Sequence, residues 1–257
     1  MRIIARSGQT QKDLSNGVSG FVSLKEASSN QNNSVGWRGI MFTNDTPLGY
    51  TLQKPPAKAW VAVGIALAAI GADFFLESFR LRSLVIGGSV LILVFLAQGE
   101  RASLGFVSRL KPSYRYWVKV TLGIGAAVAG FCIVAGFLLW TIGIRMPIPA
   151  TPPERIPSAL VSYCISAPLL EEALYRLVLC VALVRIIGPW WTIFASGAIF
   201  SALHFAWGNA SPDNFIAGYF LAWAFLKSGS ILTPVALHSI GNGCVLALHV
   251  ANWYRIS

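Results

Sequence analysis

Ionisable side chains inside apolar segments are the residues of this sequence that could do chemistry within a membrane. They are Glu171, Glu172 and Arg176 in an apolar run over 158–187, His204 in the run 190–207, and His238 in the run 231–253. A charge at the centre of a bilayer costs at least ~2.5 kcal/mol on insertion scales, so buried charges of this kind often mark functional sites. The pattern therefore indicates a candidate site shared by three of the apolar segments.

Helical geometry separates the two neighbouring acids. Glu172 and Arg176 are four residues apart, so on a helix they lie on one face and can form an ion pair. Glu171 points about 100° away from Glu172, because an α-helix has 3.6 residues per turn. Glu171 is therefore free to bind water or a second side chain, and a carboxylate in that position can act as a general base.

The same geometry gives the two later segments one polar face each. Phe200 and His204 share a face, and so do His238 and Asn242. From the rise per residue, Glu171 and His204 lie ~24 Å and ~21 Å from the turn that joins their helices. His238 comes out at only ~10 Å, so it needs either a tilted last helix or a sunken loop over 228–234.

The composition indicates what must position these residues. The 257 residues are 55% hydrophobic and only 12% charged, with a mean hydropathy of +0.62, whereas a soluble domain carries about 25% charged residues. We therefore expect an all-α, polytopic membrane bundle of about seven transmembrane helices. The apolar segments lie at about 60–77, 83–99, 117–144, 158–187, 190–207, 214–227 and 231–253.

The polar parts of the chain suggest its organisation. Residues 1–58 are polar and predict a flexible N-terminal arm with no secretory signal, followed by N-terminal transmembrane helices over 59–150 and a third part over 151–257. The net charge of +10 is spread between apolar runs, which is typical of membrane loops and argues against nucleic-acid binding. The distribution of basic residues favours a cytoplasmic N-terminus. Asp73 and Glu77 lie close to Arg80 and predict an interfacial ion pair.

The three motifs together resemble one protein family. EExxxR at Glu171–Arg176, FxxxH at Phe200–His204 and HxxxN at His238–Asn242 occur in this order on successive apolar segments. This arrangement resembles the CPBP family, which holds the type II CAAX-prenyl endopeptidases and bacterial relatives that include bacteriocin-processing and self-immunity proteins. The stretch Phe225–His238 also resembles the family's lead into its last motif, and the resemblance covers about 155–250.

The resemblance implies a metal-independent endopeptidase without a cofactor, with residues 151–257 as its catalytic part. Glu171 and His204 would activate a water, and His238 and Asn242 would stabilise the oxyanion. Arg176 with Glu172 would hold the helix in place. The expected partners are membrane lipids and a peptide or protein substrate, with or without a lipid group, and the expected location is a bacterial cell membrane.

Other interpretations remain open from the residues alone. Glu171, His204 and His238 could supply three zinc ligands, and Cys164, seven residues from Glu171, could share its face as a nucleophile. The chain could also be a non-enzymatic membrane immunity or peptide-binding scaffold protein, which would keep the cavity without the base. A transporter or channel is a further alternative, since intramembrane acids also mark ion paths. We interpret Phe200 as packing that shapes the pocket, and His249 as a packing residue.

Overall fold

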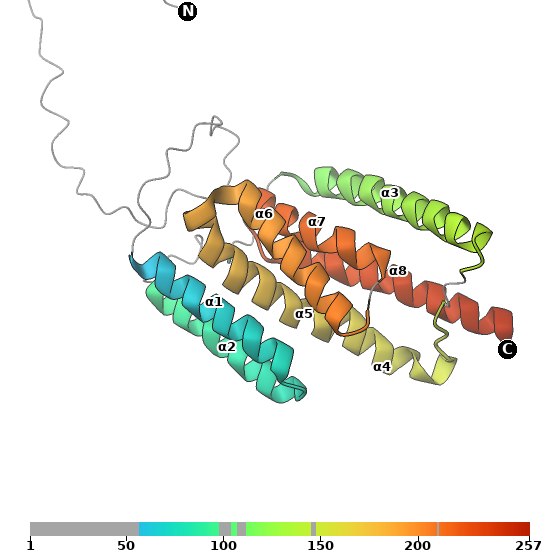
Figure 1. Ribbon diagram of the computed structural model, residues 1–257, viewed down its shortest axis with the longest axis horizontal. Helices are drawn as coiled ribbons and strands as arrows, with labels where there is room; N and C mark the ends of the chain where they lie inside the picture. The colour runs from blue at the N-terminus through green and yellow to red at the C-terminus, as the bar shows by residue number, and fades with distance from the viewer. Residues whose placement is uncertain (1–56, 98–103, 107–111, 145–147, 210) are drawn as a thin grey trace, which may run out of the picture. The chain divides into compact units, whose positions relative to one another are not determined.

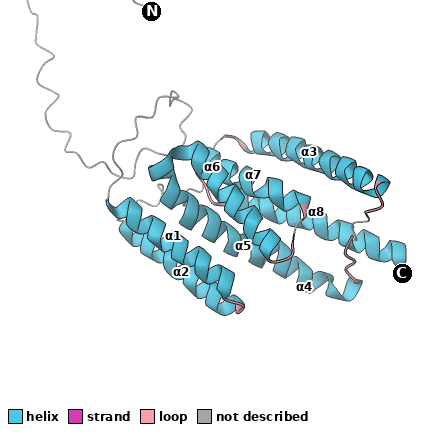
Figure 2. Ribbon diagram, viewed as in Figure 1, coloured by secondary structure: helices cyan, strands magenta, loops and turns pink. Residues whose placement is uncertain are grey.

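The computed structural model describes residues 57–97, 104–106, 112–144, 148–209 and 211–257. Every regular element in these ranges is a helix (Figure 2), so the predicted all-α class is confirmed. The predicted N-terminal arm, apart from its last two residues, lies outside the described residues.

The first two helices form a hairpin whose inner face is built from small residues. α1 (Ala57–Phe75) buries Ala59, Ala62, Ala66 and Ala69, which recur every three or four residues and so lie on one face. α1 and α2 (Phe79–Leu96) run side by side in Figure 1 and pack together. The missing side-chain bulk lets α1 also approach the helices that carry the candidate site.

α3 (Tyr114–Thr141) makes little contact with the other described helices. Its one buried residue is Trp117, whose ring lies 5.6 Å from that of Trp223 in α7. A 28-residue apolar helix with almost all of its surface exposed is unsuited to water and suited to lipid.

A single helical run, Pro153–Ala206, contains the first acidic motif and the first histidine motif. Its parts are η2 (Pro153–Arg155), α4 (Ile156–Val161), η3 (Ser162–Ser166), α5 (Ala167–Glu172), η4 (Ala173–Cys180) and α6 (Val181–Ala206), of which η3 and η4 are π-helical. Gly188 breaks the run with φ 74° and ψ 173°, and Pro189 follows it. The break separates the two segments predicted at 158–187 and 190–207.

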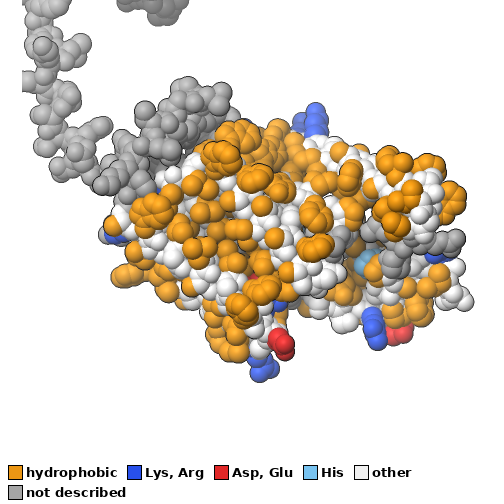
Figure 3. Space-filling view, viewed as in Figure 1, with side chains coloured by type: hydrophobic (Ala, Val, Ile, Leu, Met, Phe, Trp, Pro, Cys, Tyr) orange, Lys and Arg blue, Asp and Glu red, His pale blue; other side chains and the backbone are white. Residues whose placement is uncertain are grey.

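Two further helices complete the described structure, α7 (Pro212–Ser228) and α8 (Leu232–Ile256). Five helical runs are long and apolar enough to cross a membrane, with Pro153–Ala206 as one of them. Dividing that run at Gly188 and adding α7, which has 17 residues, gives the predicted number of about seven. Hydrophobic side chains cover much of the face seen in Figure 3, and we conclude that the protein is an integral membrane protein.

The connection between α7 and α8 is buried inside the protein. Ser228 and Ser230 are 4% and 0% exposed, and Gly229 turns the chain with φ 66°. The Ile231 N–H donates to the Gly105 carbonyl at 2.9 Å, which ties the connection to the segment after α2. The connection that leads to His238 is therefore covered by other parts of the chain.

Candidate active site

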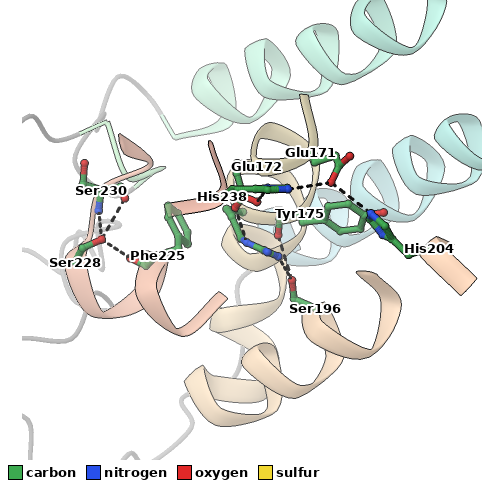
Figure 4. A network of polar contacts seen from close by, with 10 residues as sticks. Glu171, Glu172, Tyr175, Ser196, His204, Phe225, Ser228, Ser230 and His238 are labelled. Carbon is green, nitrogen blue, oxygen red and sulfur yellow. Dashed lines mark hydrogen bonds and ion pairs between the residues drawn. The ribbon is translucent and has the colours of Figure 1, made fainter. Parts of the chain in front are cut away.

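Four helical segments bring the candidate residues together (Figure 4). α5 carries Glu171 and Glu172, η4 carries Arg176, the C-terminal end of α6 carries His204, and α8 carries His238. The π-helical segments η3 and η4 flank α5 on both sides. Single π-helical turns inside α-helices are frequent at functional sites, and here they enclose the pair of acids.

The Glu171 carboxylate lies between the two imidazole rings. Its Oε2 is 3.7 Å from His204 Nε2 and 3.8 Å from His238 Nε2. Both distances are too long for direct hydrogen bonds but fall within the range of an ion pair. The Glu171 side chain is 17% exposed, whereas the side chains of His204 and His238 are 10% and 9% exposed. The acid is therefore the most accessible member of the group.

Backbone and side-chain acceptors orient both imidazoles. His204 Nδ1 lies 2.9 Å from the Phe200 carbonyl oxygen, and His238 Nδ1 lies 2.8 Å from Glu172 Oε1. A carbonyl and a carboxylate only accept hydrogen bonds, so Nδ1 carries the proton in both rings. Each ring therefore presents Nε2 to Glu171. Since Glu171 Oε2 and the two Nε2 atoms are then all acceptors, at least one additional proton or a bridging donor is needed between them.

Glu172 connects Arg176 to His238. The Glu172 Oε2 atom lies 2.8 Å from Arg176 Nε, as the four-residue spacing predicted, and both side chains are fully buried. Arg176 Nη1 also donates to Ser196 Oγ at 2.9 Å. The contact between Glu172 and His238 was not predicted, because the four-residue spacing already assigned Arg176 as the partner of Glu172. Because Arg176, Glu172 and His238 are buried together, removing one of them leaves a polar group of another without its partner.

Phe200 packs against both histidines. Its ring is fully buried, stacks on His204 with centroids 4.1 Å apart, and meets His238 edge-on at 6.1 Å. The Tyr175 ring lies 5.0 Å away, and the Arg176 guanidinium lies 5.6 Å from the Phe200 centroid. The packing role predicted for Phe200 is thus wider than expected, since the residue also supplies the carbonyl that orients His204.

A cavity of about 340 Å³ opens next to Glu171. Its lining includes Phe79, Arg82, Tyr163, Ser166, Leu170 and Glu171. Arg82 forms an ion pair with the buried Asp73, with Nε 2.6 Å from Oδ1. The predicted pairing of Asp73 and Glu77 with Arg80 is therefore wrong for Asp73, because Arg82 is one half-turn further along α2 and reaches inward.

Asn242 lies one turn beyond His238 and contacts the wall of this cavity. Its Nδ2 donates to the Tyr163 carbonyl at 2.7 Å, which fixes the amide against η3. Asn242 was predicted to share a helix face with His238. Both residues lie in α8, and the Asn242 amide is bonded to the Tyr163 carbonyl. One of its two amide hydrogens is used in the contact and the other remains for a second acceptor.

The geometry also bears on the alternative chemistries. Cys164 Sγ lies 3.9 Å from the place where a side chain on Gly243 would begin, so the thiol packs against α8. Within the described residues, no group of three or more His, Cys, Asp or Glu side chains has the arrangement of a metal site.

Comparisons with known proteins agree with the resemblance on one point. The family model described as "Type II CAAX prenyl endopeptidase Rce1-like" matches residues 153–244, which include all four predicted catalytic residues. No curated protein gives a significant match, and neither does any solved structure.

Proposed function

We propose that this protein, whose residues 153–244 match the model of the type II CAAX prenyl endopeptidase family, is an intramembrane endopeptidase in which Glu171 and His204 activate a water molecule. The observation that carries the proposal is the position of Glu171 Oε2, 3.7 Å from His204 Nε2 and 3.8 Å from His238 Nε2. Water is the natural bridge between polar atoms separated by more than about 3.5 Å. The substrate is a peptide or protein that reaches the site from within the membrane or its surface.

The first step forms a bond between water and the substrate. Water held by Glu171 and His204 gives a proton to Glu171 while its oxygen attacks the scissile carbonyl carbon. The carbonyl electron pair moves onto the carbonyl oxygen, which becomes the oxyanion. A positioned base of this kind contributes roughly 10²–10⁴-fold to the rate.

The second group stabilises the charge that forms. His238 with a proton on each ring nitrogen donates from Nε2 to the oxyanion, and Glu172 accepts from Nδ1 and holds the ring in that orientation. Asn242 donates its remaining amide hydrogen. When the tetrahedral intermediate collapses, the C–N bond breaks and the proton on Glu171 passes to the leaving amine, so the site returns to its starting state. One donor to an oxyanion is worth roughly 10²–10³-fold.

Metal independence is part of the same proposal. In this mechanism Glu171 is the base that activates the water, so no metal hydroxide is needed to attack the carbonyl carbon. The zinc interpretation predicts inhibition by chelators, and the two mechanisms are separated by that measurement.

The test uses full-length protein in lipid nanodiscs with internally quenched peptides, both farnesylated and unlipidated. We expect cleavage by the wild type and a fall of roughly 10²–10⁴-fold in Glu171→Gln and His204→Gln. Glu77→Gln is the matched control, because Glu77 is an exposed acid outside the site. Replacing all four cysteines by alanine is expected to leave cleavage intact.

Two results would contradict the proposal. Cleavage by Glu171→Gln at the wild-type rate would remove Glu171 from the mechanism. A folded wild type that binds the peptides, cleaves none of them and behaves like Glu171→Gln would instead identify a peptide-binding scaffold.

A further inference from the structure

Arg82 lines the same cavity as Glu171, although the two residues come from different parts of the chain. Glu171 belongs to α5, whereas Arg82 lies in the first turns of α2, outside the segment that matches the family. A substrate that fills this cavity of about 340 Å³ next to Glu171 therefore meets an arginine side chain.

Two neighbours hold the Arg82 guanidinium in place. Asp73, which is 3% exposed, accepts from Nε at 2.6 Å, and the Trp207 ring lies beneath the guanidinium carbon at 5.2 Å. A guanidinium has five N–H donors, and within the described residues its contact to Asp73 uses Nε alone. The Arg82 side chain is still 24% exposed. The remaining donors are thus oriented before any ligand arrives.

We infer that Arg82 is a specificity residue that binds a carboxylate of the substrate, a few residues from the scissile bond. The flat fork of a guanidinium matches the two oxygens of a carboxylate, and such a pair is stronger where the surrounding protein lowers the local dielectric. The carboxylate is either the C-terminus of the peptide or an Asp or Glu side chain. The inference depends on the proposed function, because it assumes that Glu171 acts on what the cavity holds.

A binding experiment tests the inference without requiring cleavage. The full-length Glu171→Gln protein in nanodiscs is titrated with a dansylated pentapeptide, Ala-Cys-Val-Val-Ala, as free acid, as C-terminal amide, and as an amide with Asp in place of the last Ala. We expect Arg82→Gln to weaken binding of a carboxylate peptide by about 10- to 100-fold and to leave the neutral amide unchanged. The acid and Asp forms separate the two sources of the carboxylate.

Matched variants protect the result from a folding defect. Arg80→Gln removes an exposed arginine of the same helix and should change nothing. Because Arg82→Gln leaves the buried Asp73 without its partner, the double variant Asp73→Asn/Arg82→Gln removes both charges and should show the same loss of preference. Arg82→Lys should recover only part of it.

The outcomes separate this inference from the proposed function. Equal affinity for all three peptides, no binding of any of them, or an equal loss for all three in Arg82→Gln would overturn the inference and leave Arg82 as the partner of Asp73. Cleavage that depends on Glu171 would still support the proposed function in that case. A carboxylate preference that requires Arg82 in a protein without cleavage would support the binding site alone.

Discussion

The hydrogen bond between His238 Nδ1 and Glu172 Oε1, at 2.8 Å, joins two helices across 66 positions of sequence. This bond distinguishes the environments of the neighbouring acids Glu171 and Glu172. Glu172 is fully buried between His238 and Arg176, whereas Glu171 is partly exposed and faces both Nε2 atoms. One carboxylate thus holds the framework, and its neighbour is available for chemistry.

We predict that Glu172→Gln destabilises the protein and that Glu171→Gln does not. Removing one member of a buried ion pair leaves the other charge uncompensated and costs about 3–5 kcal/mol, and here that charge is Arg176. Glu171 makes no contact short enough for a hydrogen bond with either histidine. The free energy of unfolding of the Glu171→Gln variant should therefore equal or exceed that of the wild type. Denaturant titration in mixed micelles, followed by tryptophan fluorescence, measures the difference.

Combining the substitutions provides the control for this pair. Glu172→Gln with Arg176→Met should recover part of the lost stability, because no buried charge remains unpaired. Equal stability of the two single variants would contradict the division of duties between the acids.

We predict that Phe200→Ala lowers both stability and activity. Phe200 is fully buried against Tyr175 and both histidines, and truncating a core phenylalanine costs about 3–5 kcal/mol. The matched control is Phe205→Ala on the same helix, which is 64% exposed and should change stability by less than about 0.5 kcal/mol. If the two variants had the same unfolding midpoint, the packing role of Phe200 would be wrong.

Much of this arrangement could be predicted because membranes restrict the possible structures. Apolar segments must be helices, so the helix positions followed from composition, and the four-residue spacing of Glu172 and Arg176 predicted their ion pair. The depth of Glu171 relative to His204 followed from the helical rise alone. These quantities depend on local geometry, which the sequence expresses directly.

What could not be predicted depends on contacts between distant segments. The bond from His238 to Glu172 and the inward reach of Arg82 toward Asp73 require the packing of α1, α2, α5 and α8. The π-helical turns beside Glu171 have no marker in an apolar sequence. The burial of the α7–α8 connection, with Ser228 and Ser230 covered and Ile231 bonded to Gly105, also depends on packing between distant segments.

We predict that chelation leaves peptidase activity unchanged. Incubation of the nanodisc preparation with 1,10-phenanthroline or EDTA should not slow cleavage, because the proposed mechanism activates the water with the Glu171 carboxylate and not with a metal ion. Thermolysin, a zinc protease, serves as the positive control in the same buffer. Loss of activity on chelation, restored by added zinc, would replace the proposed mechanism with a metal-assisted one.

We predict that Gly105→Ala destabilises the protein more than Gly143→Ala. The two glycines have nearly the same backbone angle, φ 85° and 84°, so alanine causes a similar strain of about 1–2 kcal/mol at both. At Gly105 the new Cβ would also lie 2.5 Å from the Phe225 ring, whereas at Gly143 it meets nothing within 4 Å. Overpacking adds about 1–3 kcal/mol, and it would displace the carbonyl that accepts from Ile231. Because that bond holds the buried connection leading to His238, peptidase activity should fall in Gly105→Ala alone. Thermal unfolding and cleavage assays of both variants measure the two effects, and equal values would mean that the connection is not tied at Gly105.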